Sequence, residues 1–317
     1  MSADIRRVGA EAAPELYAVV RAAFAGRPPL DPPSDALAET PETLAAALGA
    51  HGGLIAVIEG EVVGGLVLDP VGSLLALRRF GVVPAARHHG VAHDLVRESL
   101  VVAGELGLDG LTVLAREELE SNVGFWNNNL FTEVERRKPY VELVRPVPHT
   151  VEVTDAEAMR ALGSSLAAVL RAGDVLVLSG ELGAGKTTFT QGLGVGMQVR
   201  GDVTSPTFVI ARVHPSLVGG PSLVHVDAYR LGGIDELDDL DLDTSLDQAV
   251  TVVEWGTGVA EALADDRLHV RIDRAVGGPG GALDSDGDAG ADDDTRRVEL
   301  VPVGARWLGV TLPGRAQ

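Results

Sequence analysis

A glycine-rich segment followed by lysine and threonine constrains this sequence more than any other feature. Residues 180–187 read Gly-Glu-Leu-Gly-Ala-Gly-Lys-Thr and fit the pattern G-x-x-x-x-G-K-[ST] in full. The short apolar run 174–179 before it predicts a buried strand, and the residues after it are compatible with a helix, which is the context that the pattern requires. In such a loop, backbone N–H groups and the start of the helix surround phosphate oxygens. The sequence therefore predicts a phosphate-binding loop.

The chemistry of this loop assigns roles to residues inside and outside it. Lys186 would contact the β- and γ-phosphates of ATP, and the Thr187 hydroxyl would ligate Mg²⁺. A magnesium site needs further oxygen ligands, and the predicted strands 223–227 and 250–254 end in Asp227 and Glu254. Parallel sheets bind ligands at the carboxyl ends of their strands. We expect Lys186, Asp227 and Glu254 to be catalytic, and Thr187, Asp227 and Glu254 to hold the metal.

The chain divides into two self-contained patterns. The segment Arg145-Pro-Val-Pro-His149 contains two prolines and no periodicity, which predicts a boundary between domains at residues 1–146 and 150–317. Helices and mixed strands in the first domain predict an α+β layer. In the second domain a helix, for which residues 154–157 predict a capping box, precedes the loop, and strands follow it. That pattern predicts an α/β sheet.

Composition excludes several classes of function. The chain has 317 residues, a formal charge of −20 and no cysteine, so thiolate metal sites and cysteine nucleophiles are excluded. Contact along a nucleic-acid backbone needs clustered Lys and Arg; we therefore expect no DNA binding, and contact with RNA only through a partner. Of two acidic stretches, 284–294 predicts a solvated loop, and 235–247 predicts either a solvated face or a surface that docks on a basic partner. No apolar run approaches membrane-spanning length, and we expect a cytoplasmic protein that does not bind membranes.

Four motifs in the second half resemble those of the TsaE family. They are the loop 180–189, Thr-Ser-Pro-Thr-Phe at 204–208, His-Val-Asp-Ala-Tyr-Arg-Leu at 225–231 and Glu-Trp-Gly at 254–256. The resemblance covers about residues 150–307. It implies an α/β P-loop ATPase that uses ATP and Mg²⁺ in the synthesis of threonylcarbamoyladenosine on tRNA. It also implies partners similar to the transferase subunits TsaD and TsaB, through which tRNA is reached indirectly.

The same resemblance implies a set of nucleotide contacts. Thr207 would sense the nucleotide, and Trp255 would lie close to it. The expected ATP-binding residues are Gly180, Glu181, Leu182, Gly183, Ala184, Gly185, Lys186, Thr187, Thr188, Thr207 and Trp255.

A second phosphate-binding pattern lies in the first half. Residues 87–92 read Arg-His-His-Gly-Val-Ala, between a predicted strand and a predicted helix. The pattern resembles the R-x-x-G-x-G/A loop of GNAT acetyltransferases over roughly residues 5–144, and implies that backbone N–H groups at the helix start hold the pyrophosphate of acetyl-CoA. The expected CoA-binding residues are Val82, Val83, Arg87, His88, His89, Gly90, Val91, Ala92 and Asn122.

One residue departs from the acetyltransferase pattern. Where that family often has a tyrosine that protonates the leaving thiolate, this chain has Trp126. An indole N–H only donates hydrogen bonds and cannot act as that acid. Glu117 or Glu118 could serve as a base, although nothing in the sequence singles out either. CoA binding is therefore better supported than fast acetyl transfer.

Alternative functions remain open for both halves. The leading hypothesis is a fusion of an ATPase with an acetyltransferase-like domain. The first half could instead be a non-catalytic CoA-binding or docking module, which Trp126 favours. The second half could be a small-molecule kinase, but residues 231–266 contain no arginine to form a lid over the phosphates. Arg230 could stabilise transition-state charge or pair with the acidic stretch 235–247.

Overall fold

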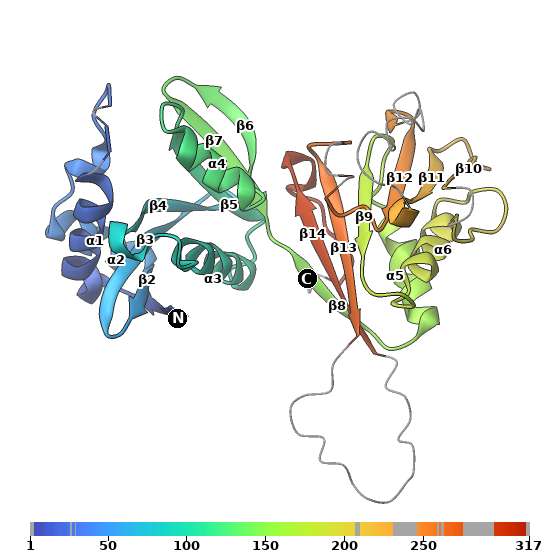
Figure 1. Ribbon diagram of the computed structural model, residues 1–317, viewed down its shortest axis with the longest axis horizontal. Helices are drawn as coiled ribbons and strands as arrows, with labels where there is room; N and C mark the ends of the chain where they lie inside the picture. The colour runs from blue at the N-terminus through green and yellow to red at the C-terminus, as the bar shows by residue number, and fades with distance from the viewer. Residues whose placement is uncertain are drawn as a thin grey trace, which may run out of the picture. The chain divides into compact units, whose positions relative to one another are not determined.

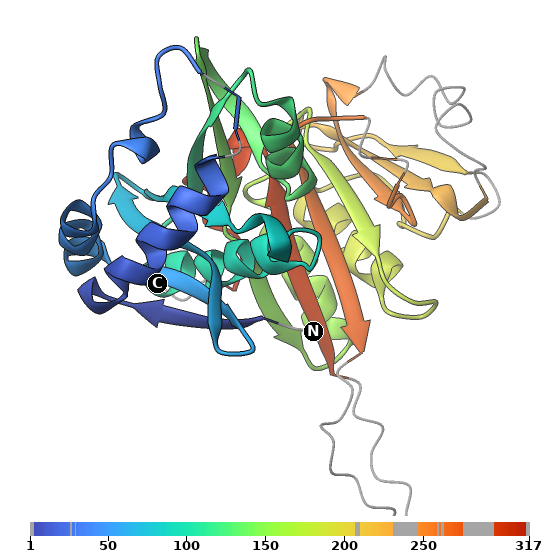
Figure 2. The ribbon, with the colours of Figure 1, turned by 60° about the vertical axis from the view of Figure 1, so that its left-hand side comes forward.

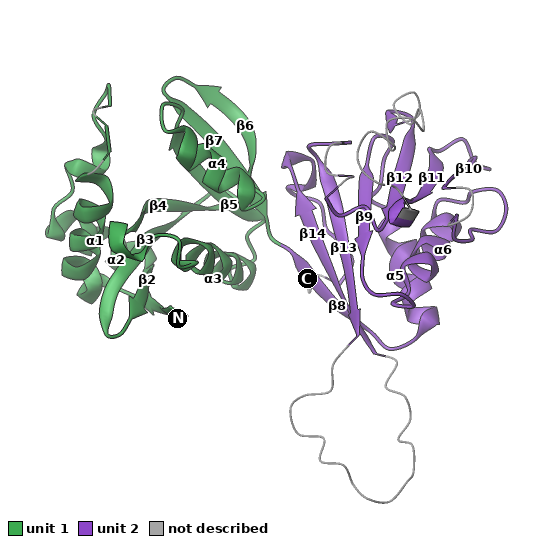
Figure 3. Cartoon of the chain, viewed as in Figure 1, with its two compact units in different colours: residues 1–147 green, residues 148–317 purple. Residues whose placement is uncertain are grey.

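The chain forms two compact units, each built on its own sheet. The computed structural model describes residues 3–25, 27–28, 30–206, 210–230, 246–258, 260, 263–274 and 295–314. The units are Met1–Val147 and Pro148–Gln317 (Figure 1, Figure 3). Each contains a seven-stranded sheet. None of the helices in the described ranges is long and apolar enough to cross a membrane.

The first unit has a mixed sheet with the strand order β1-β2-β3-β4-β5-β7-β6. Only the β4–β5 pair is parallel, and it is formed over three residue pairs, from Leu74 with Gly110 to Ala76 with Thr112. Beyond that point the two strands do not pair with each other, while β4 stays paired with β3 and β5 with β7. The elements are β1 (Asp4–Val8), α1 (Ala13–Ala25), α2 (Pro41–His51), β2 (Gly53–Ile58), β3 (Glu61–Val71), β4 (Leu74–Val82), α3 (Val91–Glu105), β5 (Gly110–Arg116), α4 (Glu120–Asn128), β6 (Thr132–Arg137) and β7 (Tyr140–Pro146).

Helices cover both faces of this sheet (Figure 2). Apolar residues of α1 and α2 pack with Val67 of β3 on one face. Leu66 and Leu68, which point the other way from Val67, pack with α3 and α4 on the opposite face. This alternation places α3, which follows the predicted CoA loop, against the sheet.

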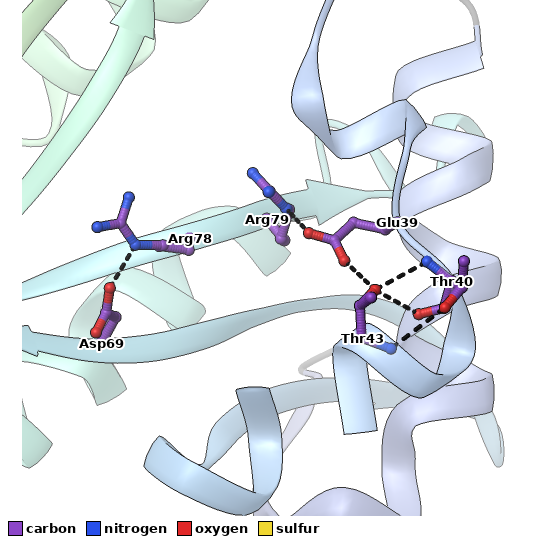
Figure 4. Close-up of polar contacts among 6 residues, drawn as sticks. All are labelled: Glu39, Thr40, Thr43, Asp69, Arg78 and Arg79. Atoms are coloured by element: carbon purple, nitrogen blue, oxygen red, sulfur yellow. Dashed lines mark hydrogen bonds and ion pairs between the residues drawn. The ribbon is translucent and has the colours of Figure 1, made fainter. Parts of the chain in front are cut away.

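A bulge in β4 is tied to the start of α2 (Figure 4). The β3–β4 register shifts between Gly65 and Val67, and Arg79 in the shifted segment has a φ of 56°. The Arg79 Nε donates to a carboxylate oxygen of Glu39 at 2.5 Å. Thr43 links Glu39 to Thr40, the N-cap of α2. The chain before α2 is thereby held over the bulge.

The second unit has a largely parallel sheet with the order β10-β11-β12-β9-β13-β14-β8. The four central strands are parallel, and the outer ones pair antiparallel. Helices α5 and α6 pack on one face with residues of β9, β12 and β13. The elements are β8 (His149–Val153), α5 (Ala156–Ala167), β9 (Val175–Ser179), α6 (Lys186–Gly196), β10 (Ala211–His214), β11 (Ser222–Asp227), β12 (Ala249–Glu254), β13 (Arg267–Arg274) and β14 (Arg296–Val303).

Helices α5 and α6 approach each other at backbone distance. A Cβ atom added to Gly192 would lie 2.1 Å from the backbone oxygen of Arg160, so any larger residue would push the helices apart. Because α6 begins with Lys186, its packing against α5 fixes where the phosphate-binding loop meets the helix.

The expected fold classes, α+β followed by α/β, are confirmed. The strands predicted at 223–227 and 250–254 are β11 and β12. Strands β6 and β8 were not predicted. The N-cap of α5 is Asp155 and not Thr154, because the Asp155 carboxylate accepts from the N–H groups of Glu157 and Ala158, both at 2.8 Å.

A buried ion pair anchors the end of the chain in the second unit. Arg306 donates to both carboxylate oxygens of Asp174 at 3.0 Å, and the two side chains are 8% and 4% exposed. Arg306→Met should destabilise this unit by about 3–5 kcal/mol, because the buried Asp174 carboxylate loses both bonds to the guanidinium. Among the described residues it would keep only the Arg171 N–H at 2.8 Å and the exposed Arg171 guanidinium at 4.0 Å.

The control is Arg271→Met. Arg271 pairs with Glu299 at the surface, with side chains 48% and 32% exposed, and such pairs contribute about 0–1 kcal/mol. Urea denaturation followed by circular dichroism measures both variants. Equal losses of stability would contradict the prediction.

Candidate functional site

The loop 180–187 joins β9 to α6, as the sequence predicts. Gly180, Gly183 and Gly185 have φ angles of 145°, 78° and 111°. A Cβ atom at Gly180 would lie 2.3 Å from the backbone oxygen of Ile272, so glycine is needed where the loop passes β13. Gly185 is the N-cap of α6, and no side chain caps this end. The first N–H groups of α6 are therefore available to an anion.

The remaining loop residues differ in exposure. Glu181, Leu182 and Gly183 form the exposed part of the loop, with Leu182 88% exposed. Ala184 is buried and Thr188 is half-buried. The loop is therefore open to solvent over residues 181–183.

Lys186 is held inside the loop. Its Nζ donates to the backbone oxygens of Gly180 and Glu181 at 2.8 and 3.0 Å and lies 3.7 Å from the centre of the Trp255 ring. Burial lowers the pKa of Lys186, and the charges of Glu254 and Asp227 partly oppose that shift. An anion at this position could take over the two protons now donated to carbonyl groups.

Glu254, at the end of β12, connects the helix to the sheet. The Thr187 hydroxyl donates to Glu254 Oε1 at 3.0 Å. The Nε2 of His225, on β11, lies 2.9 Å from the same oxygen. Glu254 is 3% exposed and His225 is fully buried. Sequence reasoning identified Glu254 and Thr187 but assigned no role to His225, although it lies in the quoted motif 225–231.

Asp227 lies beside Glu254. The two residues are register partners at the ends of the parallel strands β11 and β12, so both carboxylates reach one edge of the sheet. Asp227 Oδ1 accepts from the Tyr229 N–H at 3.0 Å, and Oδ2 lies 3.4 Å from the Ser205 hydroxyl. The Asp227 side chain is therefore oriented by backbone and hydroxyl donors.

The oxygen donors at this edge fit a magnesium ion. Thr187, Asp227 and Glu254 offer a hydroxyl and two carboxylates, and proteins commonly bind Mg²⁺ through one or two carboxylates together with substrate phosphates and water. Across the described ranges, no group of three or more His, Asp or Glu side chains is placed to hold a metal by itself. An ion here would therefore depend on the phosphates of a nucleotide.

Trp255 faces the loop because of its backbone. Its φ is 61°, and its N–H donates to the backbone oxygen of Leu178 at 3.0 Å. Its ring lies 5.4 Å from that of Tyr229, which is 66% exposed. These rings place an aromatic pair next to the loop. Tyr229 was not among the predicted site residues.

Some predicted features lie outside the described residues. They include Thr207, most of the stretch 235–247 and the stretch 284–294. Arg230 ends a short 3-10 helix, Ala228–Arg230, and its side chain also lies outside the description.

In the first unit, the segment 87–92 joins β4 to α3 through a short 3-10 helix, Pro84–Ala86. His88 and Gly90 have φ angles of 65° and 78°. Gly90 is the N-cap of α3, again without a side-chain cap. His89 contacts the backbone oxygen of Arg87 at 2.8 Å through its Nδ1. The N–H groups at the start of α3 are thus available in the same way as those of α6.

The other expected CoA-binding residues lie at the end of β4, at the start of α3 and on α4. Val82 ends β4, and the Val83 N–H donates to the backbone oxygen of Val63 at 2.8 Å. Val91 is buried in the core under α3, and Ala92 is half-buried. Asn122 lies on α4, after β5. The half-buried and buried side chains leave mainly backbone for ligand contact.

Two arginines meet at the end of α1. Arg87 Nη2 donates to the backbone oxygen of Ala23 at 3.4 Å, and Arg27 stacks 3.6 Å from the centre of the Phe24 ring. Burial, followed by the charge of Arg87, lowers the pKa of Arg27 to about 10. Both guanidinium groups lack an acidic partner among the residues that the structure describes, so this position favours an anion. No sequence pattern indicated Arg27.

Trp126 belongs to the core. It is 7% exposed, and its ring centre lies 5.0 Å from that of Phe80, 5.0 Å from that of Phe125 and 4.9 Å from that of Phe131, in edge-to-face arrangements. Its role in this unit is packing.

The two carboxylates considered as bases are both ion-paired. Glu118 binds Arg116 at 2.8 Å, and this hydrogen bond is the main reason that the pKa of Glu118 falls to about 2. Glu117 lies 3.3 Å from Arg136. A general base works best with a pKa near the working pH, so Glu118 is poorly suited to take a proton at neutral pH.

Comparisons with known proteins separate the two units. The model of the family "Threonylcarbamoyl adenosine biosynthesis protein TsaE" matches residues 153–277. A protein of that name from Streptomyces coelicolor is 61% identical over 150 residues, which are 47% of this chain and 93% of the relative. The chain belongs to the TsaE family. The Bacillus subtilis TsaE protein is 38% identical over 152 residues, which are 48% of this chain and 84% of that protein.

The TsaE match lies in the second unit, and a different family model matches the first unit. The model "Acetyltransferase (GNAT) family" matches residues 16–128. Among solved structures, the PaiA N-acetyltransferase from Thermoplasma acidophilum in complex with coenzyme A is 17% identical, with a TM-score of 0.42, and covers 46% of this chain and 99% of that one.

The carboxylates of the TsaE portion give a direct prediction. Asp227→Asn and Glu254→Gln retain shape but remove negative charge, so each should raise the Mg²⁺ concentration needed for ATP binding. Calorimetric titration of ATP at a series of Mg²⁺ concentrations measures this. An unchanged Mg²⁺ requirement in either variant would remove that residue from the metal site.

Proposed function

We propose that the second unit is a Mg²⁺-dependent ATPase that supports threonylcarbamoyl transfer to tRNA. Its membership in the TsaE family indicates a role in the synthesis of threonylcarbamoyladenosine. One observation carries the proposal of ATP hydrolysis. Lys186 and Thr187, at the open end of α6, face Asp227 and Glu254 at the ends of two neighbouring parallel strands.

Each group has a defined task in this proposal. The N–H groups at the start of α6 and the Lys186 ammonium bind the β- and γ-phosphates. Mg²⁺, when bound, neutralises charge on those phosphates. Thr187, Asp227 and Glu254 supply oxygen ligands. Glu254 uses only part of its acceptor capacity on Thr187 and His225, so its remaining lone pairs can bind the ion directly or through a water molecule.

We also propose that this ATPase works with partner proteins in the cytoplasm. The formal charge of −20 opposes direct capture of tRNA, so tRNA is reached through subunits similar to TsaD and TsaB. P-loop hydrolysis often depends on an arginine supplied by the same chain or by a partner. A partner-supplied arginine would couple hydrolysis to assembly of the transferase.

For the first unit we propose binding of CoA or acetyl-CoA with weak or absent acetyl transfer. The uncapped start of α3, together with Arg87 and Arg27, supports binding. Trp126 and the paired Glu118 favour the non-catalytic alternative, a CoA-binding or docking module.

The partner proposal predicts slow ATP turnover by the isolated chain. Adding TsaD-like and TsaB-like subunits with tRNA should raise the rate at least about tenfold, because an arginine supplied in trans can be worth about 10³–10⁵-fold. Phosphate release at low and moderate salt measures this. Lys186→Ala is the control and should abolish turnover with and without the subunits. Fast turnover by the isolated chain, unchanged by the subunits, would favour an autonomous ATPase or a kinase.

The CoA proposal predicts a charge effect at the start of α3. Arg87→Glu should weaken CoA binding by about tenfold or more, since one charged hydrogen bond contributes about 1.5–3 kcal/mol. Arg97→Glu is the matched control, because Arg97 lies within α3, away from its start, with a side chain that is 68% exposed. Calorimetry with CoA measures both variants. Absence of CoA binding by the wild type would refute this part of the proposal.

A further inference from the structure

His225 is a fully buried histidine next to the proposed metal ligands. It lies on β11, two residues before Asp227, so both side chains project from the same face of the sheet. Leu223, two residues earlier, belongs to the core cluster that includes α6. His225 therefore lies on the face covered by α6, where its Nε2 reaches Glu254 Oε1 at 2.9 Å.

The two ring nitrogens of His225 have unequal environments. An ionised carboxylate only accepts hydrogen bonds, so this bond places the proton on Nε2. The other nitrogen, Nδ1, is buried and has no hydrogen-bond partner among the described residues. Buried polar atoms are almost always paired, and an unpaired one is costly. The single bond to Glu254 is thus the one polar contact that the side chain makes in the described structure.

The hydrogen bond from His225 acts on Glu254, which also accepts a hydrogen bond from Thr187. Glu254 Oε1 accepts from the Thr187 hydroxyl, in the first turn of α6, and from His225 Nε2, on β11. With two donors on one oxygen, the carboxylate is fixed relative to the helix and the sheet. Without His225, Thr187 alone would hold it, and a carboxylate with one donor can rotate away from the position that a metal ion needs.

We propose that His225 is a positioning residue that holds Glu254 beside Thr187 for Mg²⁺–ATP. The inference rests on the proposed ATPase function and concerns the metal-dependent part of nucleotide binding. Residues around a metal site that orient its ligands commonly change affinity by about 10–100-fold when they are replaced. His225 would act entirely through Glu254 and would not touch the nucleotide.

Three substitutions of His225 separate positioning from packing. His225→Leu fills the space but cannot donate. His225→Asn keeps an amide that is too short to reach Glu254. His225→Gln places an amide near the position of Nε2 and can restore the bond. Thr251→Val, on β12, is the matched control, because the buried Thr251 hydroxyl has no hydrogen-bond partner in the part of the chain that the structure describes and takes no part in the proposed site.

The experiment compares the dissociation constant of ATP with Mg²⁺ and with EDTA by calorimetry, using the full chain, with thermal unfolding as a check of the fold. We expect the gain in affinity from Mg²⁺ to fall about tenfold or more in His225→Leu and His225→Asn. Affinity in EDTA should stay at the wild-type value. His225→Gln should recover most of the gain, and Thr251→Val should match the wild type.

Other outcomes would overturn the inference in distinguishable ways. A wild-type Mg²⁺ gain in folded His225→Leu and His225→Asn would show that Glu254 needs no help from His225. Equal losses in Mg²⁺ and EDTA, or no recovery in His225→Gln, would assign His225 a packing role alone. If the wild type itself gains no affinity from Mg²⁺, the proposed ATPase function fails together with this inference.

Discussion

The carboxylate of Glu254 is the point at which the nucleotide site of the second unit is assembled. It accepts from Thr187 at the start of α6 and from His225 on β11, and it ends β12. Three segments far apart in sequence are thereby fixed to one oxygen atom. The close approach of α5 and α6 at Gly192 also holds α6 in place, because it leaves the helix no room to shift. Rigid placement of the helix start matters because phosphate-binding donors must be aimed before the ligand arrives.

Each unit has one helix that begins at a left-handed glycine with its first N–H groups open to an anion. Helices α2 and α5 begin with side-chain caps from Thr40 and Asp155. Helices α3 and α6 begin instead at Gly90 and Gly185, which have left-handed backbone conformations and no side-chain cap. A side-chain cap would occupy the N–H groups that an anion needs. The lack of a side-chain cap weakens the starts of α3 and α6 slightly and leaves their N–H groups open to an anion.

Local patterns were sufficient to predict the glycine-rich loop between β9 and α6 and the carboxylates at the ends of β11 and β12, because both depend on contiguous strand and loop signals. Other features depend on contacts that no local pattern encodes. Arg27 meets Arg87 only after α1 packs against β4, and His225 is informative only once β11 and β12 pair. Strand β8 follows directly on a proline-containing segment, which obscured its alternation. Thr154 and Asp155 are both good caps, and the path of the chain out of β8 decides between them.

Strand β8 has a consequence for the stability of the second unit in isolation. It is the edge strand that covers β14, pairing His149 with Leu300 through Val153 with Arg296. β14 contributes Val298 and Leu300, both fully buried, to the core. A fragment that begins after Val153 would expose the unpaired backbone of an apolar strand. Such an edge is a template for intermolecular pairing. The residues next to the junction between the units thus protect the sheet from self-association, and a soluble fragment of the TsaE portion should retain them.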